Sequence, residues 1–492
     1  MRCTLVFIVI VLARAATADV PPTAIPEGPE ANSVPAFLGA PAVPRSIPSP
    51  RIPQHPFMAP NGRSNIHDDA YMTDAYITAG PLGRTPERRS TFQSAECGSL
   101  TFDGAGRIVT VCVGVEGPEL VLIDPQTLAT EAVMPLPPRS PSPGSSPFSD
   151  FSGGGYFYLD QLDRAVIPTT NRQIWVVGET TSPLGPGFSV VRMYDVSSVV
   201  VVGDGIVSAL PDWHGRIWFV SVHGVVGTVD PASGAVVSVA LDGEAIGNSF
   251  AVDETGGVFI VSDHALYRFD AGADGSPLVT WRETYDRGTR LKPGQVNFGS
   301  GTTPTLTGRC WVSITDNADP QMHVLAYRRA AAVSGPRLVC SEPVFAAGMG
   351  ATENSLIGVG THSLVVENNY GYSGLTATEN GGTTEPGITR VDFGARGCHT
   401  VWTSAERVPS TVSKVSLGAG LVYTYTKDPE TNGTDAWYFT AVDFGTGLTV
   451  YKRLAGTGLG FNNNFAPVTL GPDGTAYVGA LGGLVQIRDG QP

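Results

Sequence analysis

The chain repeats one short pattern eight times: a segment of alternating apolar residues enters a glycine-containing turn, and a second such segment leaves it. The repeats start roughly 40 to 65 residues apart. Their first apolar residues lie near Leu100, Tyr158, Ala209, Ala251, Thr305, Ile357, Gly420 and Val468. This spacing is typical of a blade of four antiparallel strands. We therefore predict an all-β fold, a β-propeller of eight four-stranded blades, with seven blades as the alternative.

The pattern is clearest in three copies, which begin at Gly215, Gly256 and Gly474. Each copy alternates apolar and polar residues, is rich in β-branched and aromatic side chains, and lacks the 3.6-residue period of a helix. Glycine (60 residues) and proline (39) are abundant enough to supply a turn after every strand. These features argue against a fold that alternates strands with helices.

The first 18 residues have the features of an export signal. Arg2 precedes the apolar run Leu5–Leu12, and Ala16-Thr17-Ala18 provides the small residues of a cleavage site. The run is too short to span a bilayer, and no later segment is long enough to do so. We predict a signal peptide at 1–18, no membrane span, and a secreted product, extracellular or periplasmic.

Residues 19–84 form a proline-rich extension that we expect to wrap partly around the propeller of residues 85–492. An open ring would expose a sheet edge, so we predict that a strand from the N-terminal side completes the last blade, Val468 to Arg488. Residues Tyr71–Thr78 are the candidate for this role. The segment His67–Tyr76 also gathers a histidine and three aspartates; we interpret it as a solvated turn, with cation binding as the alternative.

Charge restricts the possible partners. The net charge is −14, and only four lysines occur. No run of basic residues is present that could release counterions from phosphates, which excludes nucleic acid as a partner. We expect a monomer whose ligand is a small molecule or an extracellular partner.

Five cysteines follow the signal peptide. Cys97 and Cys112 flank a hairpin turn, and Cys340 and Cys398 each precede an apolar segment in neighbouring repeats, so we predict these two disulfides in an oxidising compartment. Cys310 is left as a free thiol, which we expect to be buried beside Trp311.

Carboxylate and amide side chains gather in the later repeats. If equivalent loops of successive blades meet at the axis, Asp316, Asp319, Glu353 and Glu367 become ligands for Ca²⁺, which prefers six to eight oxygen ligands. The flanking amides are candidate ligand-binding residues: Asn317, Asn354, Asn368, Asn369 and Asn463. The alternative interpretation is that these side chains cap turns.

A second candidate group lies in the seventh repeat. Two of the four lysines, Lys414 and Lys427, lie close to Tyr425 in the sequence and could form a cationic ligand-binding patch. Packing of the alternating tyrosines is the alternative.

Several segments resemble secreted bacterial proteins of the PQQ-like, or quinoprotein alcohol dehydrogenase-like, β-propeller family. The residues that carry the resemblance are Gly301–Gly308, Ile314–Pro320, Glu353–Ile357, Glu367–Gly371 and Gly458–Pro467. The resemblance covers about residues 85 to 490 and implies the propeller fold. Enzymes of that family share a blade motif ending Thr-Gly-x-x-x-Trp, whereas the nearest copy here, Asp443–Lys452, has Tyr451 in place of tryptophan. The chain also lacks both a Cys-Cys pair and a Cys-x-x-Cys-His haem site.

We therefore expect an exported propeller that binds an extracellular ligand or partner at its top face. The sequence leaves open whether the protein is an enzyme. The alternatives are a PQQ-dependent dehydrogenase and a Ca²⁺-dependent lactone or ester hydrolase that would use Glu353 or Glu367 as its catalytic carboxylate.

Overall fold

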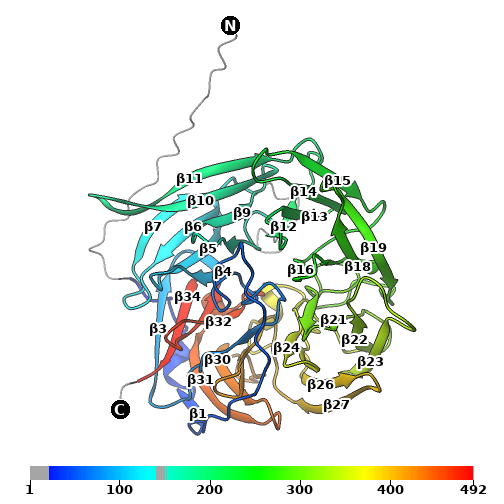
Figure 1. The fold of residues 1–492 in the computed structure, drawn as a ribbon. Coiled ribbons are helices and arrows are strands. Elements are labelled where there is room, and N and C mark those ends of the chain that lie inside the picture. The colour runs from blue at the N-terminus through cyan, green and yellow to red at the C-terminus, as the bar shows by residue number, and fades with distance from the viewer. Residues whose placement is uncertain (1–21, 140–149, 151, 491–492) are drawn as a thin grey trace.

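Eight blades, each with a core of four antiparallel strands, form a closed ring in the part of the chain that the computed structural model describes, residues 22–139, 150 and 152–490 (Figure 1). The first four blades contain β4 (Ala95–Phe102), β5 (Ile108–Gly114), β6 (Gly117–Ile123), β7 (Thr130–Pro135); β8 (Tyr158–Leu159), β9 (Ala165–Pro168), β10 (Gln173–Ser182), β11 (Gly185–Asp195); β12 (Ile206–Pro211), β13 (Ile217–Ser221), β14 (Val225–Val229), β15 (Val236–Ala240); and β16 (Ala251–Val252), β17 (Val258–Val261), β18 (Ala265–Ala271), β19 (Pro277–Thr284). The eight-bladed prediction is confirmed.

The remaining blades follow the same order, with the first strand of each nearest the axis. They contain β20 (Thr305–Thr307), β21 (Trp311–Thr315), β22 (Met322–Arg328), β23 (Leu338–Val344); β24 (Ile357–Val359), β25 (Ser363–Glu367), β26 (Ile388–Gly394), β27 (Gly397–Ser404); β28 (Lys414–Ser416), β29 (Leu421–Thr426), β30 (Ala436–Asp443), β31 (Thr449–Thr457); and β32 (Val468–Leu470), β33 (Ala476–Ala480), β34 (Gly483–Asp489) with β3 (Pro86–Phe92). Among the described residues, short 3₁₀ helices occur before β1, as η1 (Pro29–Asn32), and in later connections, as η3 (Leu375–Thr378) and η4 (Leu459–Phe461). The seventh repeat begins at Lys414 and not near Gly420, which lies before the second strand.

An aspartate recurs directly after the first strand of the first four blades: Asp103, Asp160, Asp212 and Asp253. In each case Oδ1 accepts hydrogen bonds from the backbone amides two and four residues further along. Such side-chain bonds replace backbone partners in a tight turn. The repeated Asp-containing turn therefore explains why these strands return antiparallel after so few residues.

The ring is closed by strand β3, which pairs antiparallel with β34 from Pro86 opposite Asp489 to Phe92 opposite Gly483. The predicted closure from the N-terminal side is therefore confirmed. The expectation for Tyr71–Thr78 is wrong, because β2 (Ala75–Tyr76) pairs in parallel with β28 of the seventh blade. That blade is extended further by β1 (Phe37–Gly39) on its outer edge.

An N-terminal segment, Ser64–Tyr76, runs through the centre of the ring; we call it the axial plug (dark blue trace, Figure 1). Its residues are all buried. Backbone amides at the inner strands of five blades donate to its carbonyl oxygens over 2.8–3.0 Å, those of Leu159, Val252, Leu306, Gly358 and Val415 to Ser64, Ala70, Tyr71, Thr73 and Asp74. The interpretation of His67–Tyr76 as a solvated turn is therefore wrong, because these residues fill the axis.

Two disulfides are present, as predicted. Cys97–Cys112 joins strands β4 and β5 of the first blade, and Cys340–Cys398 joins the outer strands β23 and β27 of neighbouring blades. Within the described residues Cys310 is the free thiol, but it is exposed, contrary to our expectation of a buried side chain.

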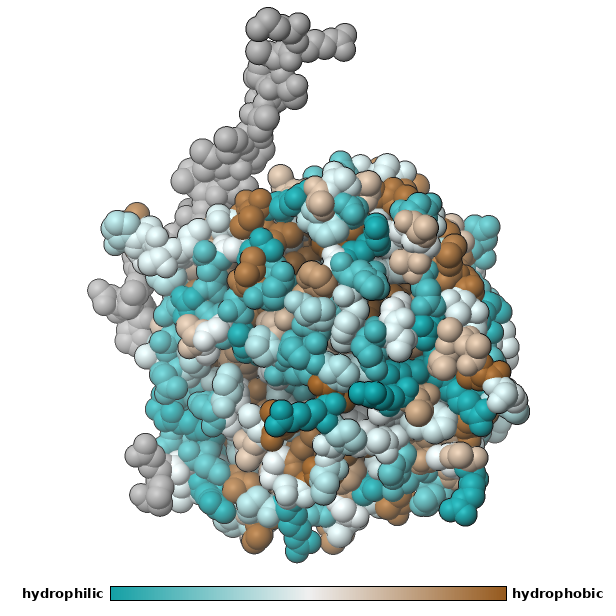
Figure 2. Space-filling model, viewed as in Figure 1, coloured by the Kyte–Doolittle hydropathy of each residue, from teal (hydrophilic) through white to brown (hydrophobic). Residues whose placement is uncertain are grey.

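Hydrophilic residues cover most of the face seen in Figure 2, and apolar residues lie between them in small groups. No helix within residues 22–139, 150 and 152–490 combines the length and apolar character needed to cross a membrane.

A candidate ligand cavity on the propeller axis

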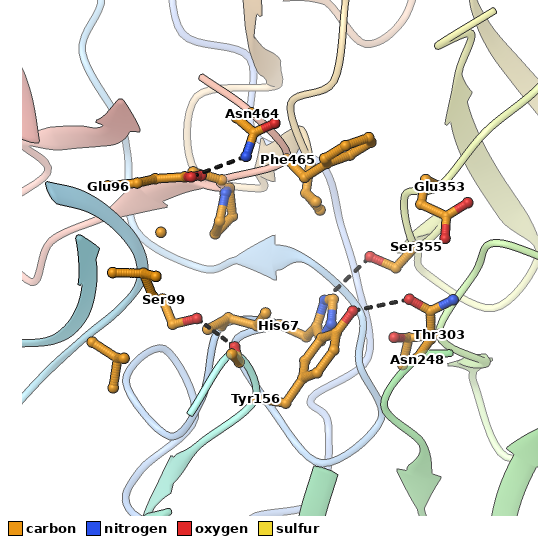
Figure 3. A pocket seen from close by; sticks show the side chains of 18 of the residues that line it. His67, Glu96, Ser99, Tyr156, Asn248, Thr303, Glu353, Ser355, Asn464 and Phe465 are labelled. Carbon is orange, nitrogen blue, oxygen red and sulfur yellow. Dashed lines mark hydrogen bonds between the residues drawn. The ribbon is translucent and has the colours of Figure 1, made fainter. Parts of the chain in front are cut away.

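A cavity of about 80 Å³ lies beside the axial plug (Figure 3). At about 10 to 15 Å³ for each water, it has room for five to eight water molecules. Most lining residues come from connections that lead from the outer strand of one blade to the inner strand of the next, among them Arg139, Asp150, Tyr156, Asn248, Thr303, Glu353, Val412, Asn464 and Phe465. Because strand direction alternates within each blade, these connections all lie at the same face of the ring.

The plug supplies His67, whose side chain is held by a buried carboxylate. The imidazole Nδ1 lies 3.0 Å from Oδ1 and 3.2 Å from Oδ2 of Asp74. The Oγ of Ser355 donates to Asp74 Oδ2 over 2.5 Å, and the Nζ of Lys414 forms an ion pair with Oδ1. Asp74 and the Lys414 side chain are fully buried.

These contacts fix which ring nitrogen of His67 carries a proton. Burial alone would raise the pKa of Asp74, but Lys414 and His67 outweigh it and hold this pKa below its usual range. An ionised carboxylate only accepts hydrogen bonds, so Nδ1 of His67 must carry the proton. In the neutral ring Nε2 is then an acceptor. His67 lines the cavity, and its Nε2 is buried without a hydrogen-bond partner among the described residues.

Glu353 also lines the cavity, at the upper right of Figure 3. Glu353 is 6% exposed, and neither of its carboxyl oxygens has a hydrogen-bond partner in the described part of the chain. Burial raises the pKa of Glu353 to about 8. Donors at Val296 and Asn297 approach the group and oppose this shift in part, although neither completes a hydrogen bond.

A second buried carboxyl group, Glu96 of strand β4, lies on another wall and differs from Glu353 in having a donor. The side-chain amide of Asn464 donates to Oε2 over 3.0 Å. Burial raises the pKa of Glu96 to about 8, while the Asn464 bond and the nearby Arg139 charge act against the shift. At neutral pH both glutamates are therefore largely protonated.

Tyr156 contributes an aromatic face and a hydroxyl group to the cavity. Its ring stacks on His67 with centroids 6.1 Å apart, and its hydroxyl donates to Oδ1 of Asn248 over 2.9 Å. Burial raises the pKa of Tyr156, and Glu353 adds to this effect. The phenol therefore stays protonated throughout the physiological range.

A wider cavity of about 770 Å³ lies between residues 290–297, residues 372–375 and the pair Asn464–Phe465. Asn464 and Phe465 also line the axial cavity, so they lie between the two spaces. Phe465 has φ = 68°, a left-handed conformation that is uncommon for an aromatic residue, and its ring packs edge-on against Tyr372 at 5.2 Å. The two cavities are therefore neighbours.

The four carboxylates predicted to bind Ca²⁺ do not share one site. Asp316 accepts hydrogen bonds from the amide and Nδ1 of His323, at 2.6 and 2.8 Å, and Asp319 lies 3.6 Å from Nζ of Lys292. Glu367 accepts from the Ser413 amide over 2.8 Å, and burial raises its pKa to about 7. No three acidic, histidine or cysteine side chains among the described residues are grouped so that they could hold a metal ion. These residues therefore do not fit a shared Ca²⁺ site.

The predicted ligand-binding amides tie connections together. Asn317 donates to the carbonyl groups of Arg287 and Arg290, and Asn354 donates to Thr411 across a blade boundary. The other three form comparable bonds, Asn368 to Met349 and Pro386, Asn369 to Val408, and Asn463 to Gly479. These contacts agree with the capping interpretation of the amides.

Lys414, Lys427 and Tyr425 do not form an exposed cationic patch, because all three are buried. Lys427 pairs with Asp435, and Tyr425 donates to the Phe461 carbonyl over 3.1 Å. Lys414 alone contributes to the axial site, through Asp74.

The sequence interpretation missed Glu96, Tyr156 and Asn248. It noticed His67 and Asp74 but placed them in a solvated turn. Their seven-residue separation, with the apolar residues Ala70–Met72 between them, was the available signal for burial.

No protein-family model matches the chain. The chain is 26% identical over 322 residues to an uncharacterised protein of Archaeoglobus fulgidus, a match that covers 58% of this chain and 62% of the relative. The chain thus spans less than two thirds of that relative's length.

Three solved structures are similar to the ring, each with a TM-score of 0.38. BamB from Moraxella catarrhalis is 13% identical and covers 65% of this chain and 93% of its own. A chain of the mitotic checkpoint complex is 13% identical, with coverage of 67% and 87%. A streptogramin B lyase is 10% identical, with coverage of 82% and 97%.

Proposed function

We propose that this protein is an exported β-propeller that binds a small organic molecule in the axial cavity. The observation that carries the proposal is the pair of buried, unpartnered polar groups that face this space, the carboxyl group of Glu353 and Nε2 of His67. Export itself is proposed from the N-terminal segment, which lies outside the described residues, and is supported by the two disulfides.

Unpartnered buried polar groups are unfavourable, each costing about 1 to 3 kcal/mol, and native proteins contain few of them. Here they converge on one cavity from separate elements, Glu353 from a connection and His67 from the plug. A ligand that offers complementary hydrogen bonds would recover this free energy. The wider cavity beyond Phe465 supplies a route of entry.

A second candidate function, hydrolysis of small esters or lactones, is favoured by the His67–Asp74 pair. Nε2 of His67 would take a proton from water as the water oxygen attacks the carbonyl carbon, and protonated Glu353 would give its proton to the departing oxygen as the C–O bond breaks. Wild-type protein would then hydrolyse γ-butyrolactone or p-nitrophenyl acetate, and His67→Asn would lower kcat. Absence of hydrolysis by the wild type would exclude this candidate.

The axial cavity does not fit PQQ, because a tricyclic quinone is several times larger than the group of waters that fills about 80 Å³. No step is assigned to that cofactor.

A cavity-filling substitution tests the binding function. Gly98 lines the cavity, and a Cβ there would approach no atom closer than 3.6 Å, so Gly98→Leu can extend into the space. Gly394, in the outer part of the sixth blade, has nothing within 4 Å of its Cβ position, which makes Gly394→Leu the matched control.

The probes are propylamine, propan-1-ol and propionate, three small molecules of one size that differ in charge. At least one probe should raise the melting temperature of the wild type and of Gly394→Leu, because binding to the folded state stabilises it. The same probe should have no effect on Gly98→Leu. If none of the three shifts the wild type, or if Gly98→Leu responds equally, the proposed function is wrong.

A further inference from the structure

When Glu353 is ionised, the unpartnered atoms in the axial cavity all accept hydrogen bonds. Nε2 of His67 accepts, because Nδ1 carries the proton toward Asp74. Oε1 and Oε2 of an ionised Glu353 also accept. The hydroxyl of Tyr156 already donates to Asn248, and the amide of Asn464 already donates to Glu96. With Glu353 ionised, the cavity therefore presents three acceptors, which an occupant rich in donors would satisfy.

We propose, building on the binding function above, that the occupant carries a protonated amine, whose N–H groups donate to Glu353 and to Nε2 of His67. A primary ammonium group has three donors and no acceptor. It can donate one hydrogen bond to each of the three unpartnered acceptor atoms. It also brings a positive charge to the carboxylate of Glu353, which forms no ion pair among the described residues.

The charges around the cavity support a cation. The carboxylate of Asp74 is already balanced by Lys414, and no described cationic side chain forms an ion pair with Glu353. The titratable groups that line the space with Glu353 are His67, Glu96, Arg139, Asp150 and Tyr156. Among them, the charge of Arg139 interacts with Glu96 and Asp150.

Aromatic faces and size limit the ligand further. Tyr156 and Phe465 line the same cavity, and a cation beside an aromatic face gains additional attraction. Space for about five to eight waters accommodates an amine with only a few carbon atoms in the cavity, while a longer substituent could extend past Phe465 into the wider cavity.

Binding of an ammonium group should release a proton. Burial raises the pKa of Glu353 to about 8, so the carboxyl group of Glu353 is mostly protonated at pH 7 when no ligand is bound. A cation beside the carboxylate favours its ionised form and lowers this pKa. Amine affinity should therefore rise close to tenfold for each pH unit between pH 6 and 7.5, until Glu353 ionises in the free protein.

Isothermal titration calorimetry of the full exported protein with propylamine, propan-1-ol and propionate tests this inference. Repeating the propylamine titration at pH 7 in buffers of different ionisation enthalpy should show release of close to one proton. Binding of propan-1-ol or propionate without binding of propylamine would overturn the amine proposal while leaving the binding function intact. Binding by none of the probes would instead contradict the binding function on which it rests.

Two variants of matched volume identify the anchoring group. Glu353→Gln should weaken propylamine binding at least tenfold and abolish proton release, because the amide cannot ionise. Glu367→Gln removes a buried carboxyl group that does not line the cavity and that accepts from the Ser413 amide, so it should change the affinity less than threefold. If the loss follows Glu367→Gln and not Glu353→Gln, or if proton release persists in Glu353→Gln, the proposed contact is wrong.

Discussion

Nδ1 of His67 lies 3.0 Å from Oδ1 of Asp74, and both side chains are buried at the axis of the ring. The same carboxylate atom is paired with Lys414 of the seventh blade. The contact thus joins a segment near the N-terminus to a blade about 340 residues later. The carboxylate of Asp74 therefore orients His67 toward the cavity and also neutralises the buried charge of Lys414.

Replacing Asp74 by asparagine should be strongly destabilising. Lys414 would lose its anionic partner at a fully buried position and keep only the Ile66 carbonyl as an acceptor, which typically lowers the free energy of unfolding by about 3 to 5 kcal/mol. Urea denaturation measures the loss. The matched control is Asp392→Asn, which breaks the more exposed pair with Arg390 and should cost less than about 1 kcal/mol. Equal losses in the two variants would contradict our description of the axial site.

Stability should fall as pH rises from about 5 to 8.5. The folded-state pKa values of Glu96, Glu353 and Glu367 are raised to about 8, 8 and 7, so the folded protein binds more protons than the unfolded chain across this window. The free energy of unfolding therefore decreases by up to about 1.4 kcal/mol per pH unit for each group. The pKa of Asp74 is lowered in the folded protein. Its contribution to stability is therefore complete above the pKa that Asp74 has in the unfolded chain, and it stays constant between pH 5 and 8.5.

Denaturant titrations at a series of pH values measure this dependence. Glu96→Gln, which cannot titrate, should show a shallower decline than the wild type. A wild-type stability that increases between pH 5 and 8.5 would mean that these carboxyl groups are ionised in the folded protein.

Two N-terminal truncations should separate the plug from the closing strand. A chain that starts at Thr85 keeps β3 but loses the axial plug, so it should lose the cavity wall formed by His67 and melt at a lower temperature. A chain that starts at Ala95 also loses β3, exposes the edge of β34 and should aggregate. Melting temperatures and light scattering report the two effects. An undiminished melting temperature for the first truncation would show that the plug is dispensable for stability.

The two disulfides should differ in their contribution. The pair Cys340–Cys398 closes 58 residues and Cys97–Cys112 closes 15. In the chain-entropy description, a typical disulfide contributes about 2 to 4 kcal/mol, and the longer loop here adds about 1 kcal/mol over the shorter one. Denaturation of the Cys97→Ala/Cys112→Ala and Cys340→Ala/Cys398→Ala variants measures both. Mass spectrometry of the unreduced wild type should find the same pairs, and a linkage through Cys310 would contradict the pairing.

The blades could be predicted from the sequence, because a strand and its turn are encoded by neighbouring residues. The alternation after Gly215 predicted β13 and β14, and the spacing of the repeats predicted eight sheets. Both disulfide partners could also be chosen, since each pair lies within one repeat or in two successive ones. Only the repeat near Gly420 was placed one strand too late.

The positions of the plug and the cavity, in contrast, depend on contacts between distant parts of the chain. His67, Glu96, Tyr156 and Glu353 are far apart in the sequence, and no local pattern indicates that their side chains face one space. The polar residues of His67–Tyr76 resemble a solvated turn until the ring surrounds them and supplies Lys414 and Ser355 as partners. Burial of these groups depends on closing all eight blades around one axis, which is a long-range property that neither composition nor spacing encodes.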